Sequence, residues 1–193
     1  MVGIVVVLLL PAGGFAFAAS KESQDSFCGS CHTQPESTYL ERSTAAQPVD
    51  LASFHTTAET RCIDCHSGKG IGGRMAAEMM GAQNALKWYT GTAVQPAPLT
   101  QPIGDANCLK CHDQVTSRSY QPKNNTLALQ GEVENGHWHL FLSRWQTQSK
   151  SAGTCASCHT GHATDGDAKI LYLNEQHTAA VCDSCHQTMG EGE

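Results

Sequence analysis

The stretch Cys28-Gly-Ser-Cys31-His32 decides how this chain can fold. Its pattern, two cysteines separated by two residues and followed at once by a histidine, returns in four later segments. These segments are Cys62-Ile-Asp-Cys65-His66, Cys108-Leu-Lys-Cys111-His112, Cys155-Ala-Ser-Cys158-His159 and Cys182-Asp-Ser-Cys185-His186. The five copies together contain all ten cysteines, so no cysteine is left for another role.

A cysteine pair with this spacing and a histidine directly after it is typical of covalent c-type haem attachment. The two thiols can form thioether bonds to the vinyl groups on one edge of a porphyrin, and the adjacent histidine can bind the iron as proximal ligand. We therefore expect five covalently bound haem c groups on the ten cysteines. The expected proximal iron ligands are His32, His66, His112, His159 and His186.

Three other uses of paired cysteines fit the pattern less well. Zinc sites also use such pairs, but they do not require a histidine directly after the second cysteine. Thioredoxin-like redox motifs occur singly on a strand-helix unit. A framework of disulfides would leave the five adjacent histidines unexplained.

The chain has as many histidines outside the motifs as it has motifs. They are His55, His137, His139, His162 and His177. A lone histidine is ordinarily a surface or core side chain, but five haems need up to five distal ligands. The numerical match favours mostly bis-histidine, low-spin iron, which has a lower potential than histidine–methionine ligation. The rival distal ligands are Met75, Met79, Met80 and Met189, although methionine more often fills gaps in packing.

The remaining composition is too poor in apolar side chains for an ordinary core. Aromatic residues make up 6% of the 193 residues, and the 40% apolar fraction includes the cysteines and an apolar N-terminus. We therefore predict a mostly α-helical fold with short helices, long irregular loops and a core formed by the haems. The net charge is −6 and there is no basic run, which excludes nucleic-acid binding.

Residues 2–19 carry no charge and are apolar. The length of this segment is at the lower limit for a membrane-spanning helix. Ala16-Phe17-Ala18 resembles a signal-peptide cleavage site, but the usual basic segment before the apolar run is missing. We favour a transmembrane anchor, or an uncleaved signal, over residues 1–20 and a pentahaem domain over residues 21–193. The predicted location is the bacterial cytoplasmic membrane, with the haem domain on the periplasmic side.

Two segments have the periodicity of helices. Met75, Met79, Ala82, Leu86 and Tyr89 recur at helical spacing, which predicts an amphipathic packing helix from Arg74 to Tyr89. A second helix is expected from Trp138 to about Ser149. Residues 92–107 are rich in proline and predict an extended linker, and residues 114–136 predict a polar surface loop. If a helix includes His137 and His139, these side chains point to nearly opposite faces, so each is expected to reach a different haem.

The order of the motifs carries a family resemblance. An apolar segment precedes Phe27-Cys28, Ser53-Phe54-His55 precedes the second motif, and His137, His139 and His162 lie around the fourth. Over about residues 1–165 the chain resembles the NapC/NirT family of membrane-anchored multihaem cytochromes. The resemblance implies electron transfer from membrane quinol to an exported redox partner. It also implies that His55, His137, His139 and His162 are distal ligands.

The chain departs from this family in three respects. Gln34 stands where family members usually carry a methionine, which puts the axial ligation of the first haem in doubt. No counterpart of the family's quinol-binding lysine and acid is evident, since Lys69, Arg74 and Glu78 are interpreted as solvated charges. The fifth motif and His177 extend the usual four-haem core. Anchored pentahaem cytochromes also occur in larger quinol-oxidising assemblies, so membership of a hetero-complex is expected.

Three functions follow, in this order. The first is an electron-transfer subunit that takes electrons from membrane quinol, directly or within a quinol dehydrogenase complex. The alternative is a soluble or extracellular electron carrier without a quinol site. The least favoured is a multihaem reductase, because all five motifs end in histidine and catalysis needs an iron with an open position.

Overall fold

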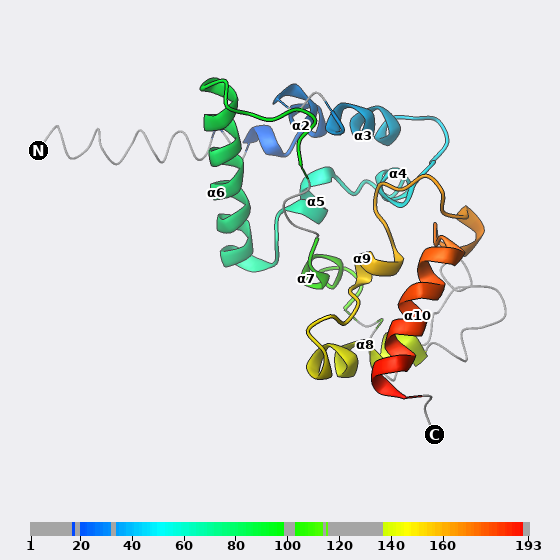
Figure 1. The fold of residues 1–193 in the computed structure, drawn as a ribbon. Helices are drawn as coiled ribbons and strands as arrows, with labels where there is room; N and C mark the ends of the chain where they lie inside the picture. The colour runs from blue at the N-terminus through cyan, green and yellow to red at the C-terminus, as the bar shows by residue number, and fades with distance from the viewer. Residues whose placement is uncertain are drawn as a thin grey trace, which may run out of the picture.

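Helices and irregular connections make up the described part of the chain (Figure 1). The computed structural model describes residue 17 and residues 20–31, 34–98, 103–113, 115 and 137–190, with only the backbone of Cys31 and His137. These residues contain no strand, and they contain one isolated β-bridge, between Asp167 and Leu173. The predicted mostly α-helical class is therefore confirmed for this part of the chain.

Each of the five cysteine motifs lies at least partly on a helix. The helices are α2 (Asp25–Cys31), α5 (Cys62–His66), α7 (Asp105–Cys108), α9 (Cys155–Cys158) and α10 (Glu175–Met189). Contacts join α2 to α5, α5 to α7, α7 to α9 and α9 to α10, so the motifs follow one another in space as they do in the sequence. Figure 1 shows this series running from α2 through the middle of the molecule to α10.

Two short helices fill the space between the first and second motifs. Helix α3 (Glu36–Ser43) packs on α2 and on α4 (Leu51–Thr56). The buried carboxylate of Asp50 caps α4 by accepting a hydrogen bond of 2.7 Å from the Ser53 amide. Arg42 pairs with Asp50 at 3.4 Å and donates to the His162 carbonyl at 3.0 Å, which holds the segment after the fourth motif against α3.

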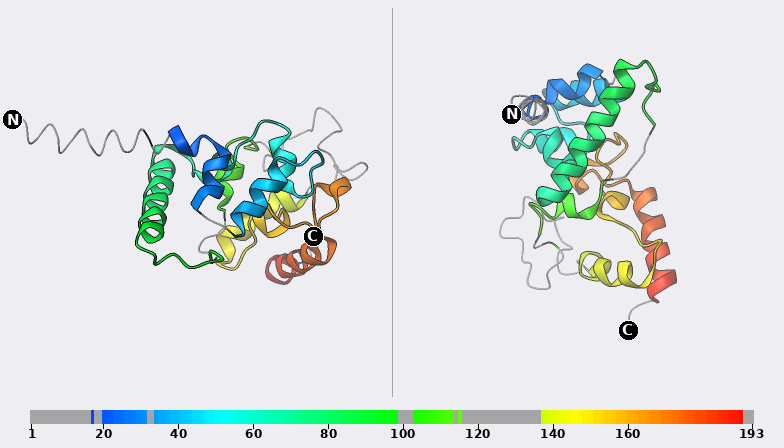
Figure 2. Two further views of the ribbon diagram at one scale, coloured as in Figure 1. Left: turned by 90° about the horizontal axis from the view of Figure 1, so that it is seen from above. Right: turned by 90° about the vertical axis from the view of Figure 1, so that its left-hand side faces the viewer.

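Both helices expected from periodicity are present. Helix α6 spans Gly70–Tyr89 and so begins four residues before the expected start. Helix α8 spans His137–Gln148 and agrees with the expectation of Trp138 to about Ser149. The expectation that α6 packs through its apolar residues is wrong, because Met75, Met79 and Leu86 are exposed. The left view of Figure 2 shows α6 standing at one edge of the molecule, and the right view looks onto α6 from that side.

The apolar core of the described residues is small. Trp145 and Tyr172, with 3% and 6% of their surface exposed, are its buried apolar side chains. Large apolar residues near the motifs, among them Phe27, Phe54 and Phe141, remain more than a third exposed. A chain of this size normally buries far more apolar surface when it folds. The small core agrees with the poor apolar composition of the sequence.

The expected N-terminal anchor lies almost entirely outside the described residues, as does most of the loop over residues 114–136. Within the described ranges, no helix has the length and hydropathy needed to span a membrane. The division at residue 20 stays a prediction.

Candidate functional site

Three histidines of the cysteine motifs each face a histidine from elsewhere in the chain. The ring centroids of His55 and His112 are 6.1 Å apart. Those of His66 and His162 are 6.4 Å apart, and those of His139 and His159 are 6.2 Å apart. Each pair contains one expected proximal ligand and one expected distal ligand.

These separations agree with two imidazoles bound to opposite sides of one metal ion. A metal–nitrogen bond of about 2 Å and a further ~1.1 Å to each ring centre place the two centroids roughly 6 Å apart. The ring planes are free to rotate about the axis through the metal. This freedom accommodates both the 89° angle between His55 and His112 and the 15–18° angles in the other pairs. The three histidine pairs therefore fit bis-histidine haem iron.

Backbone hydrogen bonds fix the orientation of two of these rings. The Nδ1 atom of His55 lies 2.8 Å from the Leu51 carbonyl within α4. The ring of His159 bonds the carbonyl of Leu171. Metal-binding histidines characteristically donate one ring N–H to a carbonyl in this way and present the other nitrogen to the metal.

His162 is held by stacking rather than by a ring hydrogen bond. Its ring lies parallel to Tyr39, with centroids 3.9 Å apart and a 7° angle between planes. Its Nδ1 atom is buried and finds no hydrogen-bond partner among the described residues. A buried polar atom without a hydrogen-bond partner is costly and rare in folded proteins. The unpartnered Nδ1 atom of His162 therefore indicates that a further group belongs beside this ring.

Desolvation keeps these imidazoles in the form that binds metal. It is the largest cause that lowers the pKa of five histidines. They are His66, His112, His139, His159 and His162. A lowered pKa favours the neutral ring, and only the neutral ring has a nitrogen lone pair available for a metal.

The first and second motifs are joined in the same way as the third and fourth. Asp25 accepts a hydrogen bond of 2.9 Å from the Cys62 amide, and Asp105 accepts one of 2.7 Å from the Cys155 amide. The thiols of Cys28 and Cys62 share a hydrogen bond, as do those of Cys108 and Cys155. The shared bond is the main cause that lowers the pKa of Cys108 to about 7. The first cysteines of the first and second motifs, and those of the third and fourth, thus lie in contact.

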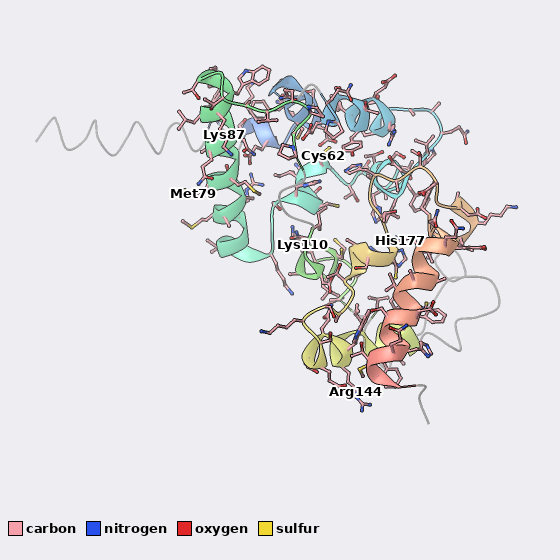
Figure 3. The ribbon with its side chains drawn as sticks, viewed as in Figure 1. Cys62, Met79, Lys87, Lys110, Arg144 and His177 are labelled. Carbon is pink, nitrogen blue, oxygen red and sulfur yellow. The ribbon has the colours of Figure 1, made fainter. Side chains whose placement is uncertain are left out.

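Asp25 and Asp105 are functional residues that the sequence reasoning missed. Each lies three residues before the first cysteine of its own motif and caps the first cysteine of the next one. An aspartate three residues before the first cysteine of both motifs is the sequence feature that could have identified them. Lys110 of the third motif donates to the Asp64 carbonyl at 2.8 Å and to the Ser67 hydroxyl at 3.1 Å. These hydrogen bonds join the third motif to the second. Figure 3 shows Lys110 and Cys62 in this central region.

The remaining expected ligands are described only in part. His32 and the side chains of Cys31 and His137 lie outside the described residues. His177 is exposed and shares α10 with His186. More than two helical turns, roughly 13 Å of rise, separate them, so they cannot bind the same iron. Among the described residues, no cluster of three or more histidine, cysteine or acidic side chains could hold a metal ion.

Two other expectations concern the iron ligands. Gln34 is engaged at the start of α3, where its amide donates to Ser37 at 3.1 Å and accepts from Thr38 at 3.0 Å. The rival ligands Met75, Met79 and Met80 are exposed on α6.

A charged cluster lies beside the first motif. Arg74 of α6 pairs with Glu22 at 2.9 Å and with Glu78 at 2.7 Å, and Glu78 is only 8% exposed. Burial is the largest cause that raises the pKa of Glu22, followed by its hydrogen bond with Glu78. The interpretation of Arg74 and Glu78 as solvated charges is therefore wrong, whereas Lys69 is exposed as expected.

Comparison with known proteins adds no further constraint. The chain matches no protein-family model, and neither the curated proteins nor the solved structures contain a detectable relative.

Proposed function

We propose that this chain is a membrane-anchored pentahaem c-type cytochrome of the NapC/NirT type. In this proposal it passes electrons from membrane quinol, directly or within a quinol-oxidising complex, to an exported redox partner. The observation that carries the proposal is the pairing of His66, His112 and His159 with non-motif histidines at 6.1–6.4 Å.

The geometry also supports an assignment of distal ligands to motifs. His162 would serve the second motif, His55 the third and His139 the fourth. Haem iron in such a site supplies reversible one-electron chemistry. The paired histidines would supply two nitrogen ligands to the iron, the motif cysteines would hold the haem covalently, and the surrounding residues would set the potential.

The arrangement of the motif helices supports a relay. Because α2, α5, α7, α9 and α10 make contact in that order, the attachment points form a series from the N-terminal end to the C-terminal end. Asp25 and Asp105 hold successive motifs together within this series. The series ends at α10, the C-terminal helix, which supports electron transfer to a partner at that end.

The charged cluster supports quinol as the electron donor. Oxidation of a quinol releases protons as well as electrons, so its site needs a proton acceptor. Glu22, with its raised pKa and its partners Glu78 and Arg74, lies between the expected anchor and Cys28. A carboxyl group with a raised pKa at this position is suited to accept and release a proton.

Haem content and reduction by quinol test the proposal together. The chain would be produced with a c-type haem maturation system, and its intact mass and haem absorbance would give the number of haems per chain. We expect five haems per chain, mostly low-spin, and their reduction by a menaquinol analogue in proteoliposomes. A chain without covalent haem would overturn the whole proposal. A fully loaded chain that takes no electrons from quinol would overturn only the quinol role.

A further inference from the structure

The outer face of α6 is an unpartnered apolar stripe. It consists of Ile71, Met75, Met79, Ala82, Leu86 and Tyr89. All six are exposed, with Ile71 at 82%, Leu86 at 65% and Tyr89 at 84%. On an ideal helix these positions fall within an arc of about 80°, so they form one continuous strip along the whole helix.

The stripe faces away from the rest of the molecule. Arg74 and Glu78 turn toward Glu22, and this contact fixes which side of α6 faces inward. Figure 3 shows Met79 pointing outward, away from the motif helices. The contacts of the described residues therefore leave the stripe uncovered.

The chemistry around the stripe suits a lipid surface. The exposed residues of α6 include no acid, and Lys87 is their one charged member. Trp88 and Tyr89 follow Lys87 at the C-terminal end of the helix. Tryptophan and tyrosine are enriched at the level of lipid headgroups, and a lysine there is attracted by anionic lipids.

The position of α6 along the chain points to the same occupant. Glu22, which pairs with Arg74, follows closely after the uncharged segment of residues 2–19. A Cβ atom at Gly81 would lie 3.3 Å from the Glu22 carboxylate, so the middle of α6 is close to the point where that segment ends. Any membrane that holds residues 2–19 is therefore near the apolar stripe.

We propose that α6 lies along the surface of the lipid bilayer with its apolar stripe inserted among the acyl chains. Helices with one apolar face bind membranes in this orientation, with the apolar face a few ångströms below the headgroups. The helix would act as a second contact beside the N-terminal segment and would fix how α2 is held at the membrane. This inference rests on the proposed membrane attachment of residues 2–19, but it does not depend on the haems or on quinol.

Lipid photo-crosslinking of the complete, cofactor-loaded chain tests the inference. The chain would be placed in nanodiscs of phosphatidylethanolamine and phosphatidylglycerol that contain a phospholipid with a diazirine on its acyl chain. After illumination, mass spectrometry would locate the lipid adducts. We expect adducts on α6 at several times the level on α8, whose Trp138 and Phe141 are also exposed apolar residues. The double variant Met79→Glu/Leu86→Glu should lose them several-fold.

The matched control is Gln83→Glu, which adds a negative charge to the same helix outside the stripe and should keep the adducts. Adducts on α6 no more frequent than those on α8 would overturn the inference. Protein crosslinks between the α6 helices of two copies would also overturn it, since a second chain would then cover the stripe. Adducts on α6 in a preparation that quinol does not reduce would support the inference while contradicting the quinol role.

Discussion

His162 connects the segment after the fourth motif to the second motif. Its ring lies 6.4 Å from that of His66 and stacks on Tyr39. If both imidazoles bind one iron, His162→Ala removes one axial ligand while Cys62 and Cys65 still hold the haem. We expect unchanged haem content and one new high-spin ferric signal in the electron paramagnetic resonance spectrum, equal to one haem per chain.

The variants His55→Ala and His139→Ala should each give the same single signal, and any two substitutions combined should give two. Gln176→Ala, at an exposed position of α10, is the control and should leave the spectrum low-spin. An unchanged spectrum in His162→Ala would contradict the assignment of this residue to the second motif.

Glu22 gives the stability of the protein a specific pH dependence. Burial and Glu78 raise its pKa, while Arg74 lowers it to a smaller extent. Between the ordinary glutamate pKa and the raised one, the folded state binds a proton that the unfolded chain has lost. The free energy of unfolding therefore falls as pH rises through the raised pKa. We expect Glu22→Gln to flatten this part of the curve, measured by denaturant unfolding at a series of pH values.

The exposed Glu41 provides the comparison for Glu22, because Glu41→Gln removes a carboxylate of the same chemistry from α3. This control should keep the wild-type pH dependence. The same slope in both variants and in the wild type would show that Glu22 does not carry the effect.

Single residues show how far the sequence could be interpreted. The motif spacing identifies the candidate cysteines and histidines, because covalent attachment demands a fixed local geometry. The pairing of His55 with the third motif, rather than with the second motif that follows it closely, depends on contacts between distant segments. Local spacing contains no information about such contacts.

At the scale of the helix, Asp105 is expected to stabilise the junction between α7 and α9. It accepts hydrogen bonds from the Cys155 amide at 2.7 Å and from the Gln146 side chain at 2.6 Å. Loss of a helix cap or of a hydrogen bond to a charged group costs about 1–3 kcal/mol. We expect Asp105→Ala to lower the free energy of unfolding of the loaded protein by that amount, measured by denaturant titration.

Asp113, exposed just after the same motif, is the matched control, and Asp113→Ala should have little effect. Asp105→Asn keeps an acceptor oxygen without the charge and should give an intermediate loss. Equal stability of Asp105→Ala and Asp113→Ala would show that this hydrogen bond does not hold the two motifs together.

Helix α6 shows what periodicity predicts and what it leaves open. The spacing of Met75, Met79, Leu86 and Tyr89 correctly predicts a helix, because one apolar face is a property of the local sequence. The expected inward packing of that face is wrong, since the inner face carries Arg74 and Glu78 paired with Glu22. An apolar stripe can contact lipid as well as a protein interior. Only the tertiary contacts show which of the two environments it faces.

At the scale of the whole molecule, the small core and the series of motif helices belong together. The described residues bury few apolar side chains, and the motif helices still contact one another in chain order. The class of fold was predictable from ten cysteines and few aromatics. The order of the motifs in space was not, because first-cysteine spacings differ along the chain and give no regular repeat from which to build it.

This order leads to a prediction about electron flow. Helix α7 contacts both α5 and α9, so the third motif lies between the first two motifs and the last two. If each motif holds a haem, as proposed, Cys108→Ala/Cys111→Ala should remove one haem from the middle of the series. In proteoliposomes with a menaquinol analogue, we expect the haems of the first two motifs to be reduced at the wild-type rate. Reduction of the last two should slow at least about tenfold, a rise of about 1.4 kcal/mol in the barrier.

The matched variant Cys182→Ala/Cys185→Ala removes one haem from the end of the series and should leave reduction of the other four unchanged. Stopped-flow absorbance separates the two variants, because a central gap leaves a slow phase and a terminal loss only lowers the amplitude. Far-UV circular dichroism, which reports the helix content of the whole chain, would confirm that both variants fold. Rapid reduction of all remaining haems in the central variant would contradict a series and indicate branched contacts, because electrons would then bypass the third motif.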